Sequence, residues 1–385
     1  MKLLWLVPSH ICFLMVVLMN HTAQGQTKPR TSTAPQQRKA LLNATKNVQS
    51  YIMPSEEEPH EGTWLQWPHN YGWDPHHVER YEPIWIALTR ALHRSERVHI
   101  IVYNQAELRR VRALLRSHRM DMRQIDFWDY PTDDVWVRDN GPIFVYDANN
   151  KDQLTVENWM FNGWGNKADW WYDDYIPIDV ARDWPLPRVD VDMVNEGGSV
   201  EVDGHGTLMA KKSSILNPNR NPGWTLADVE DYFTTYLGVT NFIWLEGKVG
   251  LDITDDHIDG TARFASPNKI VTMQATDLTD PAEYDILANA KNAHGEPYEL
   301  VHLPLTKKLI GDFQGVYVNF YVANEVVIVP IYNDENDAEA LRILGEVYPS
   351  RTIEGILMEE LYQDGGAAHC VTQQQPMATR RRRNV

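Results

Sequence analysis

The stretch YEPIWIALTRALHRSERVHIIVY, residues 81–103, carries the pattern that decides the fold class. Its first part holds five apolar residues with the spacing of one helix face: Ile84, Trp85, Leu88, Ala91 and Leu92. This spacing predicts a helix over Tyr81–Ser95. The β-branched run Val98–Tyr103 follows within a few residues and predicts a strand. A helix that leads directly into a strand is typical of an α/β protein.

The same alternation continues on both sides of this stretch, so we predict a mixed α/β protein with many short strands. Further helices are predicted at Gln105–Ser117, Thr225–Leu237, Pro281–Asn292 and Asp334–Val347. Strands are predicted at Ile125–Trp128 and Phe242–Leu245, and a hairpin from Val316–Val322 and Glu325–Pro330. No linker interrupts residues 51–376, which predicts a single domain there, and no internal repeat is legible in the residues.

The composition narrows the classes of partner that the chain can bind. Its 385 residues are 43% hydrophobic, which excludes a disordered chain or a collagen-like fibre. Asp and Glu number 53 against 36 Lys and Arg, so the formal net charge is -17. This excess of acid argues against binding to the backbone of a nucleic acid. It favours cationic small molecules or cationic protein surfaces.

The two ends of the chain carry signals of their own. Residues 1–25 are typical of a secretory signal peptide, because Lys2 precedes an apolar run and Ala23-Gln24-Gly25 forms a small-residue cleavage site. A membrane anchor is the alternative, but the run is shorter than the roughly 20 residues that span a bilayer and contains Pro8. We therefore expect a secreted protein that does not span a membrane. Residues 26–50 are predicted to form a flexible leader, and residues 377–385 a basic, disordered tail.

The cysteine count directs attention to one thiol. Cleavage after Gly25 would remove Cys12 and leave Cys370 as the sole cysteine, without an internal disulfide. A single cysteine of this kind can be buried and inert, can form a disulfide with another chain, or can be a reactive thiol. The residues around it indicate which of these three roles applies. Five loops rich in glycine, acid or aromatic residues are the places where chemistry is expected. They are Trp136–Pro142, Asn162–Lys167, Asn195–Gly198, Asp255–Gly260 and Gly365–Cys370.

The last two loops offer the parts of a nucleophilic site. A nucleophilic thiol needs a general acid/base partner, usually a histidine. His257 and Asp259 project to the same side of an extended segment, so His257 is the better partner for Cys370. His369 adjoins the cysteine and points to the opposite face of an extended segment, which makes it a poor partner. Gly366 would let the backbone approach a ligand closely.

A metal site and a cysteine protease are the competing interpretations. A metal is disfavoured because no second cysteine lies at ligand spacing and no His-x₃-His pair lies on a predicted helix. A protease does not need the surplus acids Asp139, Glu196 and Asp259, which would raise the pKa of a thiol and suppress the thiolate. A cationic substrate resolves this conflict, since two carboxylates can hold a guanidinium and present its carbon to sulfur.

From Tyr51 to Pro376, the chain resembles the agmatine deiminase and bacterial-type peptidylarginine deiminase family, within the guanidine-modifying (pentein) superfamily. The residues that carry the resemblance are the five loops together with Met53-Pro54, Glu58–Trp64, Trp67-Pro68, Leu216–Pro222 and Cys370–Pro376. The resemblance implies a five-bladed α/β propeller with pseudo-fivefold symmetry and the site on its axis. In place of Ala367-Ala368 the family commonly has an Asn followed by a larger aliphatic residue.

The resemblance also implies the role of each site residue. Cys370 would be the nucleophile and His257 the general acid/base. Asp139 and Asp259 would bind the guanidinium, Glu196 would sit beside the reacting nitrogen, and Trp136 would pack on the alkyl part of the substrate. No metal or organic cofactor is required.

The predicted reaction is deimination of a guanidinium through a covalent adduct on Cys370. We favour agmatine, giving N-carbamoylputrescine and ammonia, with Asp133-Asp134 as candidates for binding the distal amine. A secreted deiminase acting on peptidyl or free arginine is the alternative, and a catalytically silent extracellular binding protein is the third. Asp173-Asp174 and Asp255-Asp256 are expected at exposed turns. The sequence is compatible with a homodimer.

Overall fold

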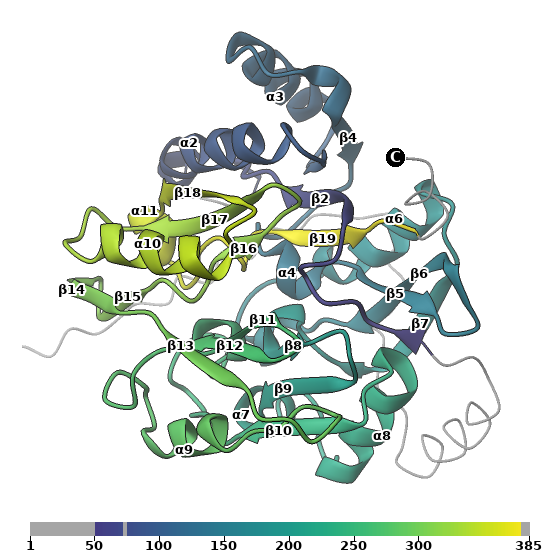
Figure 1. The fold of residues 1–385 in the computed structure, drawn as a ribbon. Coiled ribbons are helices and arrows are strands. Elements are labelled where there is room, and N and C mark those ends of the chain that lie inside the picture. The colour runs from purple at the N-terminus through teal and green to yellow at the C-terminus, as the bar shows by residue number, and fades with distance from the viewer. Residues whose placement is uncertain (1–50, 72–74, 379–385) are drawn as a thin grey trace, which may run out of the picture. The chain divides into compact units, whose positions relative to one another are not determined.

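The computed structural model describes residues 51–71 and 75–378 (Figure 1). The predicted signal peptide and leader lie outside the described residues, as do residues 379–385 of the predicted tail. Within the described part of the chain, no helix combines the length and the apolar content needed to cross a bilayer.

Five of the six sheets repeat one arrangement. A first strand pairs antiparallel with a second strand, a helix follows, and a third strand pairs parallel with the second. Parallel neighbours need such a crossover, because the chain must return to the same end of the sheet before the next strand begins. The α/β class predicted from the sequence is therefore confirmed.

We name these five repeats units A to E. Unit A is β5 (Ile143–Asp147), β6 (Asn150–Met160), α6 (Ile176–Asp183) and β7 (Arg188–Val194). Unit B is β8 (Val200–Val202), β9 (Thr207–Lys211), α8 (Leu226–Leu237) and β10 (Asn241–Leu245). Unit C is β11 (Arg263–Ser266), β12 (Lys269–Thr272), α9 (Ala282–Ala288) and β13 (Glu299–His302). Unit D is β16 (Tyr321–Val322), β17 (Val326–Ile331), α10 (Asp337–Val347) and β18 (Thr352–Leu357). Unit E is β19 (Gln373–Pro376), β2 (His60–Gln66), α2 (Pro75–Leu92) and β3 (Arg97–Val102).

The remaining elements extend or connect the units. The strands are β1 (Tyr51–Ile52) on unit A, β4 (Ile125–Asp129) on unit E, and a separate hairpin of β14 (Leu305–Ile310) and β15 (Phe313–Val316). The α-helices are α3 (Gln105–Ser117), α4 (Val137–Asn140), α5 (Gly163–Asn166), α7 (Lys212–Ile215) and α11 (Glu359–Tyr362). Short 3-10 helices lie at Met122–Gln124, Asp173–Tyr175, Gly197–Ser199 and Ile258–Gly260.

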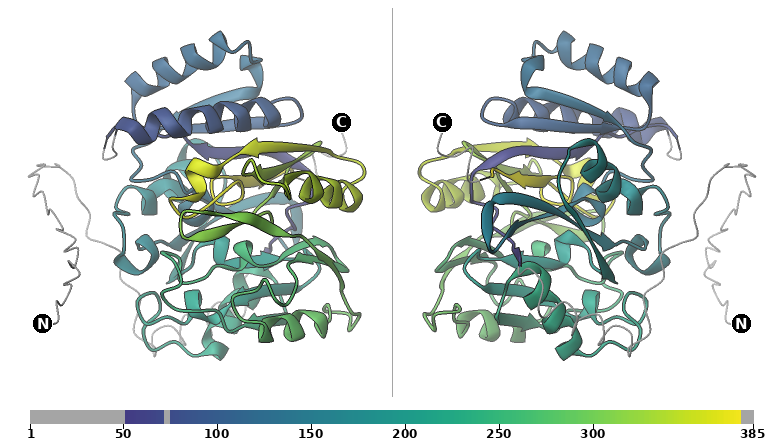
Figure 2. Two further views of the ribbon diagram at one scale, coloured as in Figure 1. Left: turned by 90° about the vertical axis from the view of Figure 1, so that its left-hand side faces the viewer. Right: turned by 90° about the vertical axis from the view of Figure 1, so that its right-hand side faces the viewer.

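Unit E joins opposite ends of the described chain. Its first strand, β19, pairs antiparallel with β2, so the yellow strand of Figure 1 lies against a purple one. The purple helix α2 also contacts β18 of unit D, and Figure 2 shows the two lying alongside each other.

The apolar core is divided into five clusters, and each cluster is shared by two units. In chain order they join A to B, B to C, C to D and D to E, and the fifth joins E back to A. Burial of these side chains is the main favourable term in folding. It therefore fixes each unit against both of its neighbours.

Local signals explain the best-predicted helix, α8. The hydroxyl of Thr225 accepts from the amide of Asp228, whose carboxylate accepts from the Thr225 amide in return. This capping box satisfies backbone donors that a helix start leaves open. Gly238 ends the helix in the left-handed conformation, with φ of 72°.

Other predicted elements differ from the structure at their ends. Helix α2 begins at Pro75, six residues before the predicted start, because its first turn is polar and shows no apolar period. The predicted strand Val316–Val322 is wrong in its middle: β15 ends at Val316, and β16 contains only Tyr321–Val322. The residues between them leave the sheet, and one of them, Asn319, contributes to the site described below.

The constraint at Gly238 can be tested by substitution. A Cβ there would lie 2.1 Å from the carbonyl oxygen of Tyr51, whereas at Gly223, with a similar φ of 75°, it would meet nothing within 4 Å. We expect Gly223→Ala to lower the free energy of unfolding by about 1 to 2 kcal/mol, through left-handed strain alone. Gly238→Ala should cost roughly 2 kcal/mol more, because the backbone must also move. Urea unfolding of both variants checks this, and equal losses would contradict it.

Candidate active site

Five segments supply the site, and each lies directly before the first strand of one unit. They are α4 before β5, Gly197–Ser199 before β8, Ile258–Gly260 before β11, residues 317–320 before β16 and residues 365–372 before β19. Because the five units repeat one arrangement, these segments occupy equivalent positions in them. Loops placed by rigid elements are the usual carriers of catalytic groups.

Hydrogen bonds join the first three segments to one another. The Gly198 amide donates to Oδ1 of Asp139 at 3.0 Å, which ties α4 to the next segment. Nε2 of His257 lies 2.8 Å from Oε2 of Glu196. These two residues directly precede Ile258–Gly260 and Gly197–Ser199, so their contact joins the second segment to the third.

Further hydrogen bonds close these segments into a ring. Nδ2 of Asn319 donates to the carbonyl oxygen of Asp259 at 3.4 Å, and the His369 amide donates to the Asn319 carbonyl at 3.1 Å. The Arg138 amide then donates to the carbonyl oxygen of Cys370 at 3.2 Å. The ring brings together residues that are far apart in the sequence.

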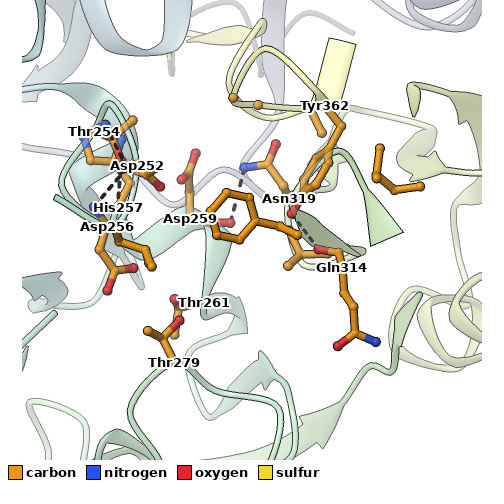
Figure 3. A pocket seen from close by; sticks show the side chains of 18 of the residues that line it. Asp252, Thr254, Asp256, His257, Asp259, Thr261, Thr279, Gln314, Asn319 and Tyr362 are labelled. Atoms are coloured by element: carbon orange, nitrogen blue, oxygen red, sulfur yellow. Dashed lines mark hydrogen bonds between the residues drawn. The ribbon is translucent and has the colours of Figure 1, made fainter. Parts of the chain in front are cut away.

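A cavity of about 440 Å³ opens beside this ring. Cys370, His257, Asp259, Asn319 and Gly366 all line it. Figure 3 shows Asp259 between His257 on one side and Asn319 on the other. The structure therefore brings the predicted nucleophile, base and guanidinium-binding acid into one cavity.

His257 is surrounded by negative charge. Its Nδ1 lies 3.7 Å from Asp139, and its Nε2 bonds to Glu196. Burial disfavours the imidazolium, but the charge of Asp139, the bond to Glu196 and the charge of Asp259 outweigh it and raise the pKa of His257 to about 9. At neutral pH this histidine can act as a proton donor.

Asp139 accepts from two neutral donors, the Gly198 amide and the indole N–H of Trp164 at 2.8 Å. Burial, together with the charges of Asp259 and Glu196, raises its pKa to about 6, although His257 acts in the opposite direction. Its charge is therefore only partly compensated, which suits a carboxylate that receives a cationic substrate.

Asp259 has a much more acidic carboxyl group. Burial favours its neutral form, but the hydrogen bond and charge of His369, with smaller contributions from His257 and Arg263, lower its pKa to about 2. Its Oδ2 lies 2.8 Å from Nδ1 of His369 and 3.5 Å from Sγ of Cys370. An ionised carboxylate is thus held beside the thiol.

Cys370 is a half-buried free thiol. Burial and the charges of Asp259 and Asp139 raise its pKa well above the ordinary value. Nδ2 of Asn319 lies 3.2 Å from Sγ and can donate to a thiolate. The thiol is therefore neutral at rest, and a cation bound nearby would favour its ionisation.

Two glycines keep space open in the site. A Cβ on Gly198 would lie 2.7 Å from Oδ1 of Asp139, 2.7 Å from Nδ1 of His257 and 3.1 Å from Oδ2 of Asp259. A Cβ on Gly366 would lie 2.6 Å from the Trp136 ring. Trp136 is thus packed against a residue that lines the cavity.

The structure does not bring the acid pair Asp133 and Asp134 into the cavity. Asp133 accepts from the backbone amides of Tyr172 and Asp173. Asp134 accepts from the Val135 amide and interacts with the side chain of Trp136. Asp134 therefore supports Trp136, while Asp133 holds the segment that contains Tyr172 and Asp173.

The expectation that Asp173-Asp174 and Asp255-Asp256 form exposed turns is wrong, because all four are buried. Asp255 pairs with Arg220 and Asp256 with Lys211. Asp174 accepts from the Phe161 amide and Asp173 from that of Asp133. These partners lie far away in the sequence, so a local pattern typical of a turn could not reveal them.

Three residues that shape the site were not predicted from the sequence: Arg220, Asn319 and Gly198. Arg220 binds Glu196 through Nε at 2.8 Å and Nη2 at 3.2 Å, and so holds the carboxylate that faces His257. Asn319 lies within a predicted strand and Gly198 within a predicted loop, so the sequence pattern singles out neither residue. Asn319 and Gly198 each lie directly before the first strand of a unit. This shared position could have identified both as site residues, but it is recognised only once the repeated units are known.

No group of three or more His, Cys, Asp or Glu side chains in the described part of the chain has an arrangement that could hold a metal ion.

The fold and site define a guanidine-modifying enzyme of the pentein class. The model of the family described as Porphyromonas-type peptidyl-arginine deiminase matches residues 52–376. The chain belongs to this family, which includes the agmatine deiminases.

Similar proteins agree with this assignment. A Legionella pneumophila protein named "Putative agmatine deiminase" is 32% identical over 348 residues, covering 87% of this chain and 98% of its own. A Streptomyces coelicolor protein of the same name is 33% identical, covering 85% and 99%. The solved agmatine deiminase of Enterococcus faecalis is 26% identical with a TM-score of 0.76, covering 91% and 99%. The chain is therefore a hydrolase of C–N bonds in amidines, and its reaction is guanidine deimination.

Gly198 offers a test of the site geometry. We expect Gly198→Ala to lower kcat/KM for ammonia release by at least about 100-fold, because the new methyl group displaces Asp139, His257 and Asp259 from one another. Gly260→Ala is the matched control: Gly260 lies in the neighbouring segment of the site and lines the cavity, and its Cβ would meet nothing within 4 Å. Equal activities of the two variants in an ammonia assay would contradict the geometry.

Proposed function

We propose that this enzyme converts agmatine to N-carbamoylputrescine and ammonia. The observation that carries the proposal is the charge of the cavity wall. The residues that line it include Asp252, Asp277 and Asp312 besides Asp259, and no lysine or arginine of the described part of the chain lines it. Such a wall attracts a substrate with a cation at each end and repels the carboxylate of free arginine.

The proposed chemistry begins when Asp139 and Asp259 bind the guanidinium. Its positive charge favours the Cys370 thiolate, whose proton leaves through the water of the cavity because His257 is already protonated. Sulfur attacks the guanidinium carbon, and His257 gives its proton to the departing ammonia. The same histidine, now neutral, activates the water that releases the ureido product.

An arginine side chain within a peptide is the second candidate substrate. It lacks the free carboxylate that the acidic wall repels, and Phe313, 51% exposed on the hairpin β14–β15, also lines the cavity. Residues that flank such an arginine would have an apolar surface to contact.

We further infer that units A to E surround one axis as a five-bladed propeller with the site at its centre. The five shared apolar clusters and the ring of hydrogen bonds support this arrangement. Secretion is likewise proposed, from the sequence of residues 1–25 alone.

Substitution of the thiol tests the reaction. We expect Cys370→Ala to lower ammonia release from agmatine by about 10⁴-fold or more, because no other nucleophile is placed at the guanidinium carbon. Binding of agmatine, measured by calorimetry, should persist because Asp139 and Asp259 remain. In the same assay, the wild-type enzyme should prefer agmatine to free arginine and to an arginyl peptide. Retained activity in Cys370→Ala, or preference for free arginine, would overturn the proposal.

The pH profile tests the roles of the acids and the base. Below about pH 6 Asp139 becomes protonated and loses the guanidinium, and above about pH 9 His257 loses the proton it must donate. We therefore expect a bell-shaped profile of kcat/KM with limbs near these values. In Glu196→Gln the alkaline limb should move to lower pH, because the bonded anion that favours the imidazolium is gone. An unchanged alkaline limb would contradict this role of His257.

A further inference from the structure

His369 lies next to the nucleophile in the sequence but is not among the residues that line the cavity. Its ring is almost fully buried and lies between two carboxylates. Nδ1 is 2.8 Å from Oδ2 of Asp259, and Nε2 is 3.0 Å from Oε2 of Glu56. A third carboxylate, Glu201, lies 3.9 Å from Nε2, beyond hydrogen-bonding distance.

The chemistry of these contacts determines the protonation of the ring. An ionised carboxylate only accepts hydrogen bonds, and both ring nitrogens donate only in the imidazolium. Burial favours the neutral form of each acid, but Arg263, His369 and Arg138 hold the pKa of Glu56 well below its ordinary value. Asp259 is likewise ionised, with a pKa of about 2. With a carboxylate oxygen at hydrogen-bonding distance from each ring nitrogen, the geometry fits a ring that donates from both.

Glu56 is placed to fix this ring. Its Oε2 accepts from His369 and from Nη2 of Arg138 at 3.1 Å. Its Oε1 accepts from Nη2 of Arg263 at 2.9 Å and from the Val322 amide at 2.8 Å. One carboxylate outside the cavity thus receives four donors from four different parts of the chain.

We infer that Glu56 and His369 are positioning residues for the guanidinium-binding carboxylate. Glu56 holds His369 as an imidazolium, and this cation holds Asp259 ionised with its Oδ2 fixed beside Cys370. Neither residue lines the cavity, so both act through Asp259. The inference rests on the proposed role of Asp259 in binding the guanidinium.

The wild-type protein gives the first test. In a protein labelled with ¹⁵N-histidine, the two ring nitrogens of His369 should both carry a proton at neutral pH, with the signal assigned by its loss in His369→Gln. A ring with one unprotonated nitrogen under these conditions would overturn the inference. This measurement needs no substrate, so it decides the protonation even if the enzyme does not act on agmatine.

Two matched variants give the second test. Glu56→Gln keeps the shape of the side chain but removes the carboxylate that is hydrogen-bonded to Nε2. Glu201→Gln removes a carboxylate from the same network that lies 3.9 Å from Nε2 and makes no hydrogen bond to it. We expect Glu56→Gln to leave one ring nitrogen unprotonated and to raise KM for agmatine by about 10-fold, with kcat changed by less than about 3-fold. The reason is that Asp259 holds the substrate equally in the ground and transition states. Glu201→Gln should keep both ring protons and a KM within about 2-fold of wild type.

The outcomes separate the inference from the proposed function. If Glu56 and Glu201 only stabilise the fold, both variants should have a lower Tm and the folded enzyme should keep its KM for agmatine. An unchanged KM in Glu56→Gln therefore overturns the inference. If Glu56→Gln does not fold, His369→Gln replaces it, since its amide can donate to Asp259 without a charge, and the same rise in KM is expected. Absence of ammonia release from wild type would refute the proposed substrate, while the nitrogen signals would still report on His369.

Discussion

Four carboxylates in and behind the site are the constraint on which the rest of it depends: Asp139, Glu196 and Asp259, which are buried, and Glu56, whose side chain is 9% exposed. A buried ion costs several kcal/mol unless an opposite charge and hydrogen bonds compensate it. Arg138 contacts Glu56, Arg220 contacts Glu196, and the ring of His369, an imidazolium in our proposal, contacts Asp259. Among the residues that the structure describes, Asp139 has only neutral donors and the more distant His257 at 3.7 Å. Asp139 is therefore the least compensated of the four carboxylates, and a guanidinium would complete its pairing.

The repeated units explain how such a site can be built without a long, strained segment. Each unit needs to deliver only one or two groups, from the few residues before its first strand. The apolar clusters shared between neighbouring units then fix these residues against one another. Because cores are densely packed, each carboxylate keeps its place relative to its cation. This precision matters, since a buried charge that loses its partner destabilises the fold.

The sequence predicted those parts of the structure that depend on short-range patterns. The helices α3 and α8 follow from apolar spacing and capping residues, and the Cys370–His257–Asp259 set follows from residue chemistry and loop composition. The cations that compensate the carboxylates were not predicted, because no local pattern links them to their partners. Glu56 and His369, for example, are separated by more than three hundred positions. The residues alone do not show the repeat, which only the family resemblance implies, since the five units share strand pairing and not a legible sequence pattern.

The two alanines before His369 show how the fold absorbs a departure from the family pattern. Ala367 and Ala368 are fully buried in the apolar cluster that joins units D and E, where a polar side chain would need a partner. The backbone of Ala367 and Nδ2 of Asn319 both favour the ionised form of Cys370. The missing amide side chain at position 367 therefore leaves the thiol with two donors, one of them from another unit. Stabilisation of the thiolate depends on that unit's position as much as on the residues next to the cysteine.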